Sequence, residues 1–159
     1  MAESMITDEM KSKIGVESEP EVYEVTVQMI QRFIQATGDS NPLWQDEENV
    51  KRSKYGGIIA PPTIIPVIGW ERFLALQVKS LLRGKMLHAG TELDCYKPVR
   101  LGDRISVTNK VANIRELQSE TGRALLVIFE GTYKNQNREL VAKCQQKLIG
   151  YEAGETKNG

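Results

Sequence analysis

The 159-residue sequence has little histidine and little cysteine, and both shortages narrow the chemistry open to it. A single histidine, His88, excludes a histidine-rich zinc or iron site and any acid–base scheme that needs two imidazoles from one chain. The two cysteines, Cys95 and Cys144, do not form a CxxC pair. We therefore expect reduced thiols that pack as small core residues in a cytoplasmic protein without a metal site.

The chain also lacks net charge and long apolar runs. Its 21 basic and 21 acidic side chains cancel, which argues against nucleic acid or an anionic membrane surface as a partner. No apolar run approaches the roughly 18 residues that a membrane-spanning helix requires. The remaining composition, 40% hydrophobic and 26% charged, is typical of a globular domain.

The sequence predicts one domain between two tails. We expect residues 1–13 to form a flexible tail or a short surface helix, and residues 152–159 to form a second flexible tail. Residues 14–151 form the domain. A chain of this length buries about 70% of its unfolded surface, which is enough for a hydrophobic core without disulfides.

The first half of the domain predicts one strand, two helices and two loops. A strand over residues 22–25 runs into a helix that Thr26 caps and Gly38 ends. Two turn-rich loops, at residues 38–42 and 55–63, flank a second, short helix that carries acidic residues at its start.

The longest helical pattern runs from Ile64 to about Arg83. Apolar residues surround it almost completely, so it should be buried and wrapped by other elements. Four runs rich in β-forming residues follow, at residues 88–99, 104–117, 123–134 and 139–151. Their short connections predict antiparallel pairing between successive runs. The predicted fold class is therefore α+β, with an antiparallel sheet of about five strands wrapped around one long central helix. Because open sheet edges are commonly protected by another subunit, we expect a dimer or a higher assembly.

Two loop motifs carry a resemblance to a known family. Residues 36–43, ATGDSNPL, and residues 55–63, YGGIIAPPT, resemble the hydratase motif of the MaoC-like (R)-specific enoyl-CoA hydratases. They are more closely similar to the subgroup named for the dehydratase region of type I fatty acid synthase. Residues 96–103, YKPVRLGD, are similar to a strand-turn signature of the same family. The resemblance covers roughly residues 14–151 and implies a hot-dog fold, in agreement with the α+β prediction.

In catalytic members, the resemblance implies an Asp and a His that activate a water for addition to an enoyl thioester, or for the reverse dehydration. A backbone N–H at the start of the central helix polarises the thioester carbonyl. Here Asp39 stands at the Asp position, but Trp44 replaces the His and Pro62 replaces the glycine that donates the N–H. An indole cannot accept a proton and proline has no N–H. The resemblance therefore implies incomplete machinery.

The implied ligand is an acyl-CoA or acyl-carrier-protein thioester, with no further cofactor. Asp39 is the candidate catalytic residue, and the candidate substrate-binding residues are Asn41, Trp44, Tyr55, Gly56, Gly57, Pro62 and Thr63. Several of these also have a purely structural interpretation. Asp39 is suited to closing a turn, and the two aromatic side chains are suited to packing on the core.

Three functions stay open. The first is an acyl-binding, catalytically incomplete subunit of a hydratase or dehydratase, paired with a second hot-dog chain that carries an Asp/His pair. The second is a self-sufficient hydratase or dehydratase that uses Asp39 with Thr63 or His88. The third is a hot-dog thioesterase with Glu71 as its carboxylate, or a non-enzymatic acyl-thioester binder. An ordinary surface pair between Glu71 and Arg72 is the simpler interpretation of that carboxylate.

Overall fold

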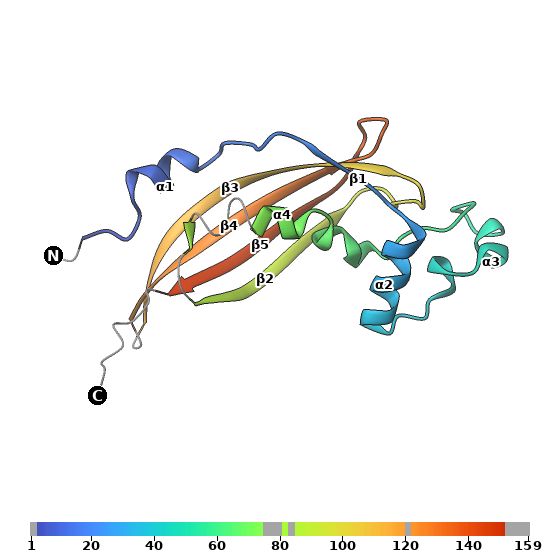
Figure 1. Cartoon of the computed structure of the whole chain (residues 1–159), viewed down its shortest axis with the longest axis horizontal. Coiled ribbons are helices and arrows are strands. Elements are labelled where there is room, and N and C mark those ends of the chain that lie inside the picture. The colour runs from blue at the N-terminus through green and yellow to red at the C-terminus, as the bar shows by residue number, and fades with distance from the viewer. Residues whose placement is uncertain (1–2, 75–80, 83–84, 120–121, 152–159) are drawn as a thin grey trace.

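The computed structural model describes residues 3–74, 81–82, 85–119 and 122–151 (Figure 1). The predicted tail at residues 152–159 and the 75–80 part of the predicted central helix lie outside the described residues. In chain order the elements are α1 (Asp8–Lys13), β1 (Glu21–Glu24), α2 (Val27–Thr37), η1 (Pro42–Trp44), α3 (Glu47–Lys51), η2 (Pro62–Val67), α4 (Trp70–Phe73), β2 (Met86–Cys95), β3 (Arg104–Ser119), β4 (Gly122–Lys134) and β5 (Leu140–Tyr151).

The five strands form one antiparallel sheet in the order β1-β3-β4-β5-β2. The predicted pairing of successive runs is correct for β3, β4 and β5. It is wrong for β2, which pairs with β5 at the far edge, with Leu93 opposite Cys144. The physical reason is that the segment after β2 crosses the end of the sheet instead of turning back. Its Tyr96 N–H donates to Val141 of β5, and its Gly102 N–H donates to Val25 beyond β1.

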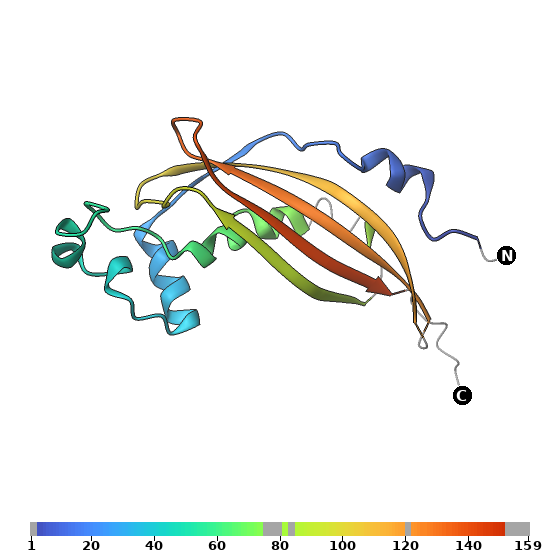
Figure 2. The same ribbon diagram turned by 180° about the vertical axis from the view of Figure 1, so that it is seen from behind.

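The sheet curves around the helical segment formed by η2 and α4 (Figures 1 and 2). Along β4 and β5 every second side chain turns toward this segment, as the two-residue repeat of a strand requires. Val127 and Val141 are fully buried there, and Phe129 and Tyr133 are 2% and 3% exposed. The core therefore lies between the concave face of the sheet and the helical segment.

The predicted single central helix is broken in the structure. The 3-10 helix η2 and the short helix α4 meet at Gly69, whose φ of 76° is left-handed. A side chain there would also place its Cβ 3.0 Å from the ring of Tyr23. Pro66 cannot donate an intrahelical hydrogen bond, so a continuous α-helix is disfavoured on both sides of the junction. Val67 is 55% exposed, so burial all around this segment is also a wrong prediction.

Two hydrophobic clusters divide the core along the length of the sheet. The first cluster joins the loop end of the molecule to the sheet, and includes Val25, Ile30, Trp44, Ile59, Ile64, Ile65 and Tyr133. The second cluster fills the other end, and includes Phe73, Leu81, Leu82, Val111, Ile114, Val127, Phe129 and Leu148. Cys144 is buried in the first cluster as predicted, whereas Cys95 is exposed at the end of the edge strand β2, so its predicted core position is wrong.

The two edges of the sheet differ in how far other segments cover them. Beside β1, the β3 edge is covered by the N-terminal segment, where Gly15 N–H donates to Val111 and Ser18 N–H donates to Asn109. This segment contains α1, so of the two structures expected for it, a flexible tail or a short surface helix, residues 8–13 form the helix. Its side chains Met5, Ile6 and Met10 pack on the second cluster. Among the described residues β2 pairs only with β5, which leaves its outer edge open.

Candidate functional site

The first candidate loop is fixed by its own hydrogen bonds. Helix α2 ends at Gly38, which is left-handed with a φ of 70°, as the sequence predicted. The next residue, Asp39, is half-buried, and its Oδ1 accepts the backbone N–H of Asn41 at 3.1 Å. Its Oδ2 accepts the indole Nε1–H of Trp44 at 2.9 Å. Both carboxylate oxygens of Asp39 are therefore bonded to N–H groups of the same loop.

Trp44 belongs to the core as well as to this loop. It ends η1, is 9% exposed and packs in the first cluster with Ile59 and Ile64. Asn41 is exposed, and its side chain caps η1 by accepting the Leu43 N–H at 3.0 Å. The structural interpretations of Asp39 and Trp44 thus both describe contacts that are present.

The second candidate loop lies against the first. The backbone N–H of Ile59 donates to the carbonyl of Leu43 at 3.4 Å, and Ile59 pairs with Arg100 in an isolated bridge. Tyr55 is half-buried against the first cluster, and its carbonyl accepts a hydrogen bond from the Arg100 guanidinium. Gly56 is left-handed, with a φ of 68°. The structure therefore brings together the two loops that the sequence singled out.

An outer groove runs along the surface of these loops. One part, of about 190 Å³, is lined by Trp44, Val27, Ile30, Gln31, Gln45, Glu47, Ile58 and Leu101. The adjoining part, of about 250 Å³, is lined by Gly56, Gly57, Arg100, Lys51, Glu47, Ile58 and Leu101. Ile58, Leu101 and Glu47 line both parts, so the groove leads from Trp44 to the glycine pair.

The start of η2 offers few hydrogen-bond donors. Pro61 is buried, Pro62 is exposed at the first helical position, and neither has a backbone N–H. The Thr63 amide is among the first-turn N–H groups that lack an intrahelical partner, and Thr63 is exposed. Because η2 ends before Gly69, it lacks the length of aligned peptides that a long central helix would supply at this point.

The remaining candidates do not join the two loops. His88 lies on β2 opposite Leu148 of the second cluster, and its Nε2 is 2.9 Å from the Thr91 hydroxyl. Glu71 is exposed on α4. The predicted pair of Glu71 with Arg72 is not formed, because the Arg72 Nε lies 2.6 Å from a carboxylate oxygen of Glu21 instead.

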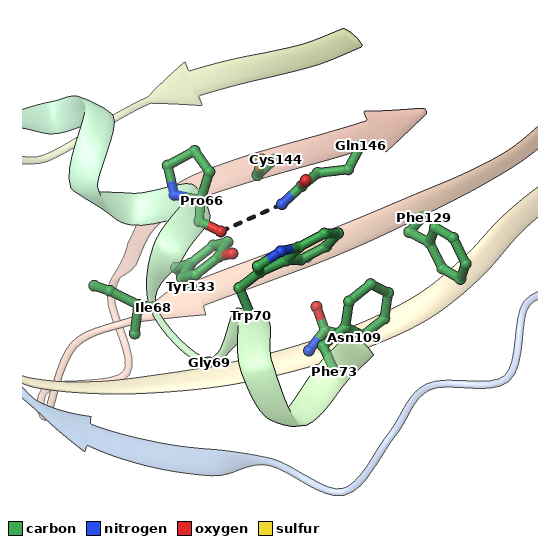
Figure 3. Close-up of a pocket in the computed structure, with 11 residues that line it drawn as sticks. Pro66, Ile68, Gly69, Trp70, Phe73, Asn109, Phe129, Tyr133, Cys144 and Gln146 are labelled. Carbon is green, nitrogen blue, oxygen red and sulfur yellow. Dashed lines mark hydrogen bonds between the residues drawn. The ribbon is translucent and has the colours of Figure 1, made fainter. Parts of the chain in front are cut away.

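A second hollow, which we call the inner pocket, lies between the helical segment and the sheet (Figure 3). It is lined by Pro66, Ile68, Gly69, Trp70, Phe73, Asn109, Phe129, Gly131, Tyr133, Cys144 and Gln146. Its volume of about 10 Å³ is room for about one water molecule. The Gln146 side-chain amide donates to the Pro66 carbonyl at 3.3 Å, which ties β5 to η2.

The inner pocket was not predicted, although the sequence contains a signal for it. Asn109 lies at an inward position between Val107 and Val111, and Gln146 lies likewise between Cys144 and Leu148. Polar residues at positions that alternation assigns to the core indicate either an internal hydrogen bond or a ligand site.

Two features are absent from the described residues. No helix in this part of the chain is long and apolar enough to cross a membrane. Within the same residues, no three His, Cys, Asp or Glu side chains gather in a way that could hold a metal ion.

The family model of the FAS1-like dehydratase domain region matches residues 12–144. The chain therefore belongs to this family of MaoC-like hot-dog proteins, whose members include hydratases and dehydratases. A relative from Streptomyces avermitilis, named "UPF0336 protein", is 31% identical over 84% of this chain and 88% of its own length. The "Probable enoyl-CoA hydratase alpha subunit" of Thermomonospora curvata is 24% identical over 83% of this chain and 46% of its own length.

Solved structures of two dehydratases have a similar fold. The MaoC-like dehydratase of Rhodospirillum rubrum is 25% identical, with a TM-score of 0.67 over 87% of this chain and 92% of its own. The 3R-hydroxyacyl-ACP dehydratase complex HadBC of Mycobacterium tuberculosis contains a chain that is 20% identical, with a TM-score of 0.73 over 91% of this chain and 99% of its own. The predicted α+β hot-dog fold is thus confirmed.

Proposed function

We propose that this chain is the acyl-binding, catalytically incomplete subunit of a hydratase or dehydratase that interconverts trans-2-enoyl and 3-hydroxyacyl thioesters of CoA or an acyl-carrier protein. The observation that carries the proposal is the bonding of Asp39. Its two oxygens accept N–H groups from Asn41 and Trp44, and the indole that occupies the family's histidine position cannot take a proton. Without a base, water adds to the double bond only slowly.

The start of η2 supports the same proposal. An enolate-like transition state needs hydrogen-bond donors that point at the thioester oxygen. Pro61 and Pro62 supply none, and the break at Gly69 shortens the helix whose dipole would assist. The losses at Trp44 and Pro62 are independent, and both remove parts of one reaction.

The missing groups would come from a second hot-dog chain that carries an Asp/His pair. The outer edge of β2 is a place where such a chain can add a strand, because among the described residues no other strand pairs with it. Met86 and Leu87 at its start are 39% and 55% exposed, so pairing there would also bury apolar surface. The heteromeric dehydratase among the structural relatives is a precedent for such an assembly in a related protein.

The test is activity with and without the second chain. The chain is affinity-purified from its native host, and hydration of a short trans-2-enoyl-CoA is followed by the loss of enoyl absorbance. We expect turnover only in fractions that contain a second hot-dog subunit, and we expect Asp39→Asn in this chain to leave most of that turnover intact. Turnover by this chain alone that Asp39→Asn abolishes would establish the self-sufficient enzyme instead, and release of free thiol from a saturated acyl-CoA would establish a thioesterase.

A further inference from the structure

The two ends of the outer groove differ in charge. Apolar side chains make up most of the end beside Trp44, where Glu47 is the one charged residue of the lining. At the other end, beside the glycine pair, Lys51 and Arg100 line the groove together with Glu47, so this lining carries one more positive than negative charge. A bound molecule with an apolar part and an anionic part is therefore oriented along the groove, with its anionic part at the glycine end.

Arg100 is held in place at both of its ends. Its backbone N–H donates to Oδ2 of Asp103 at 2.7 Å, and that carboxylate is itself 7% exposed. Its guanidinium donates to the carbonyl of Tyr55, which immediately precedes the glycine pair. A guanidinium has five N–H donors in a planar fork that matches the oxygens of a phosphate, and the Tyr55 carbonyl occupies one of them. The remaining donors are therefore positioned at the groove before any ligand binds.

The positive charges at the glycine end are not neutralised by the protein. Within the part of the chain that the structure describes, neither Lys51 nor Arg100 forms an ion pair with a carboxylate. On the sheet, by contrast, Lys110 pairs with Glu130 at 2.9 Å. Cations that no carboxylate neutralises are suited to charge-assisted hydrogen bonds with a bound anion.

Gly57 lies between these cations and is a glycine that the fold itself does not require. Its neighbour Gly56 is left-handed, with a φ of 68°, whereas Gly57 is not among the glycines of positive φ. A Cβ at Gly57 would have no other atom of the protein within 4 Å. Neither the backbone angle nor a close neighbour therefore explains the missing side chain. Its absence leaves room at the lining of the groove for a bound group to approach the backbone.

We propose that the glycine end of the outer groove is a subsite for the phosphate of the pantetheine arm that carries the acyl group, with Arg100 and Lys51 as its ligands. This inference rests on the proposed function, which brings the thioester to the loop of Trp44 and Asp39. The apolar end of the groove reaches Trp44, whose indole N–H donates to Asp39, so an arm laid along the groove has its thioester there and its phosphate beside Gly57. Coenzyme A and an acyl-carrier protein both present a phosphorylated pantetheine arm, so the chemistry of the subsite is the same for either.

The test titrates the purified full-length chain, by calorimetry, with hexanoyl-pantetheine and with hexanoyl-4′-phosphopantetheine, which differ only in the phosphate. We expect the phosphorylated compound to bind about tenfold more tightly, the gain of one charge-assisted hydrogen bond. This preference should shrink as the salt concentration rises, because exposed charges are screened. Hexanoyl-CoA and a hexanoyl-acyl-carrier protein then distinguish the two sources of the phosphate, since the one that binds more tightly is the carrier that this chain takes.

Substitutions locate the phosphate on the groove. Arg100→Gln and Lys51→Gln should each reduce the preference for the phosphorylated compound, the double variant should abolish it, and all should leave the affinity for hexanoyl-pantetheine unchanged. Gly57→Ala fits the backbone without a clash, so it should keep the wild-type unfolding temperature and weaken binding of the phosphate. Glu47→Gln removes the carboxylate of the lining and should increase the preference. The matched control is Arg52→Gln, which removes a positive charge from the neighbouring exposed position outside the lining and should keep the preference.

The outcomes separate this inference from the proposed function. Equal affinity for hexanoyl-pantetheine and its phosphorylated form overturns the inference and leaves the proposed function standing. Failure of every acyl thioester to bind overturns both. A preference that survives in the double variant, or that Arg52→Gln reduces as strongly as Arg100→Gln, also overturns the inference, because another part of the chain or its overall charge would then attract the phosphate.

Discussion

The loop that holds Asp39 and the inner pocket that holds Tyr133 place their polar groups in different surroundings. At the loop, each oxygen of the Asp39 carboxylate already accepts an N–H from Asn41 or Trp44. In the inner pocket, Tyr133 and the half-buried Asn109 line a hollow with room for about one water molecule. The candidate carboxylate is hydrogen-bonded within its own loop, whereas the polar groups beneath the helical segment face a water-sized hollow.

The largest loss of stability is expected when a buried aromatic side chain that lines the inner pocket is removed. Phe129 is 2% exposed and meets Phe73 edge to face, with ring centroids 4.8 Å apart. Phe129→Ala should lower the free energy of unfolding by about 3–5 kcal/mol, because it leaves a cavity in the second cluster. Denaturant unfolding measures this loss. The control Ile128→Ala, on the half-buried outer face of the same strand, should cost clearly less. Equal losses would contradict the assignment of Phe129 to the core.

A smaller loss of stability is expected from a substitution of Asp39 in the first candidate loop. Asp39→Ala removes both acceptors and leaves the buried Trp44 indole N–H without a partner, which should cost about 1–3 kcal/mol of unfolding free energy. Asp39→Asn retains one acceptor oxygen and should cost less. The neighbouring exposed Ser40 provides the control, and Ser40→Ala should be close to neutral. If Asp39→Ala is also neutral in thermal unfolding, the carboxylate is not held by its own loop and is free for chemistry.

The smallest effect concerns the N-terminal segment that covers the second cluster beyond the pocket. The Glu116 carboxylate accepts hydrogen bonds from the Ser4 hydroxyl, the Arg123 guanidinium and the Met5 N–H, which lowers its pKa to about 2. Because this pKa is lower in the folded chain than its ordinary value of 4.5, the ionised carboxylate stabilises the segment at pH values above about 4.5. This contribution is lost as the pH falls from about 4.5 to about 2. The Met5 amide should lose protection from hydrogen exchange over this range.

Glu116→Gln is the control for that titration. Its neutral amide keeps an acceptor for the Met5 N–H, so the protection that remains should not change over the same range of pH. Protection at Met5 that stays constant in the wild-type chain would contradict the contact between the N-terminal segment and β3.

Local features of this fold could be predicted from the sequence because each depends on neighbouring residues. Thr26 caps α2, Gly38 ends it, and Asp46 caps α3 through hydrogen bonds or backbone angles set within a few positions. The alternation at the start of β3 and along β5 likewise indicates which face is buried. The two candidate loops came from motif resemblance, and the structure places them in contact.

The features that were predicted wrongly depend on distant partners. The helical pattern continues through Gly69, but Tyr23 occupies the space that a helix side chain would need. Cysteine is usually a buried residue, yet Cys95 is exposed at the end of an edge strand. The inner pocket was missed because Asn109 and Gln146 become neighbours only when three strands pair. Such pairings cannot be derived from spacing along one chain.

The most direct test of the account is a single titration of the purified chain with a short trans-2-enoyl-CoA, in which heat and enoyl absorbance are recorded together. The account predicts saturable binding heat with no loss of absorbance, because Trp44 cannot act as a base and Pro62 cannot donate to the thioester. Steady loss of absorbance that follows the binding curve and disappears in Asp39→Asn would contradict it.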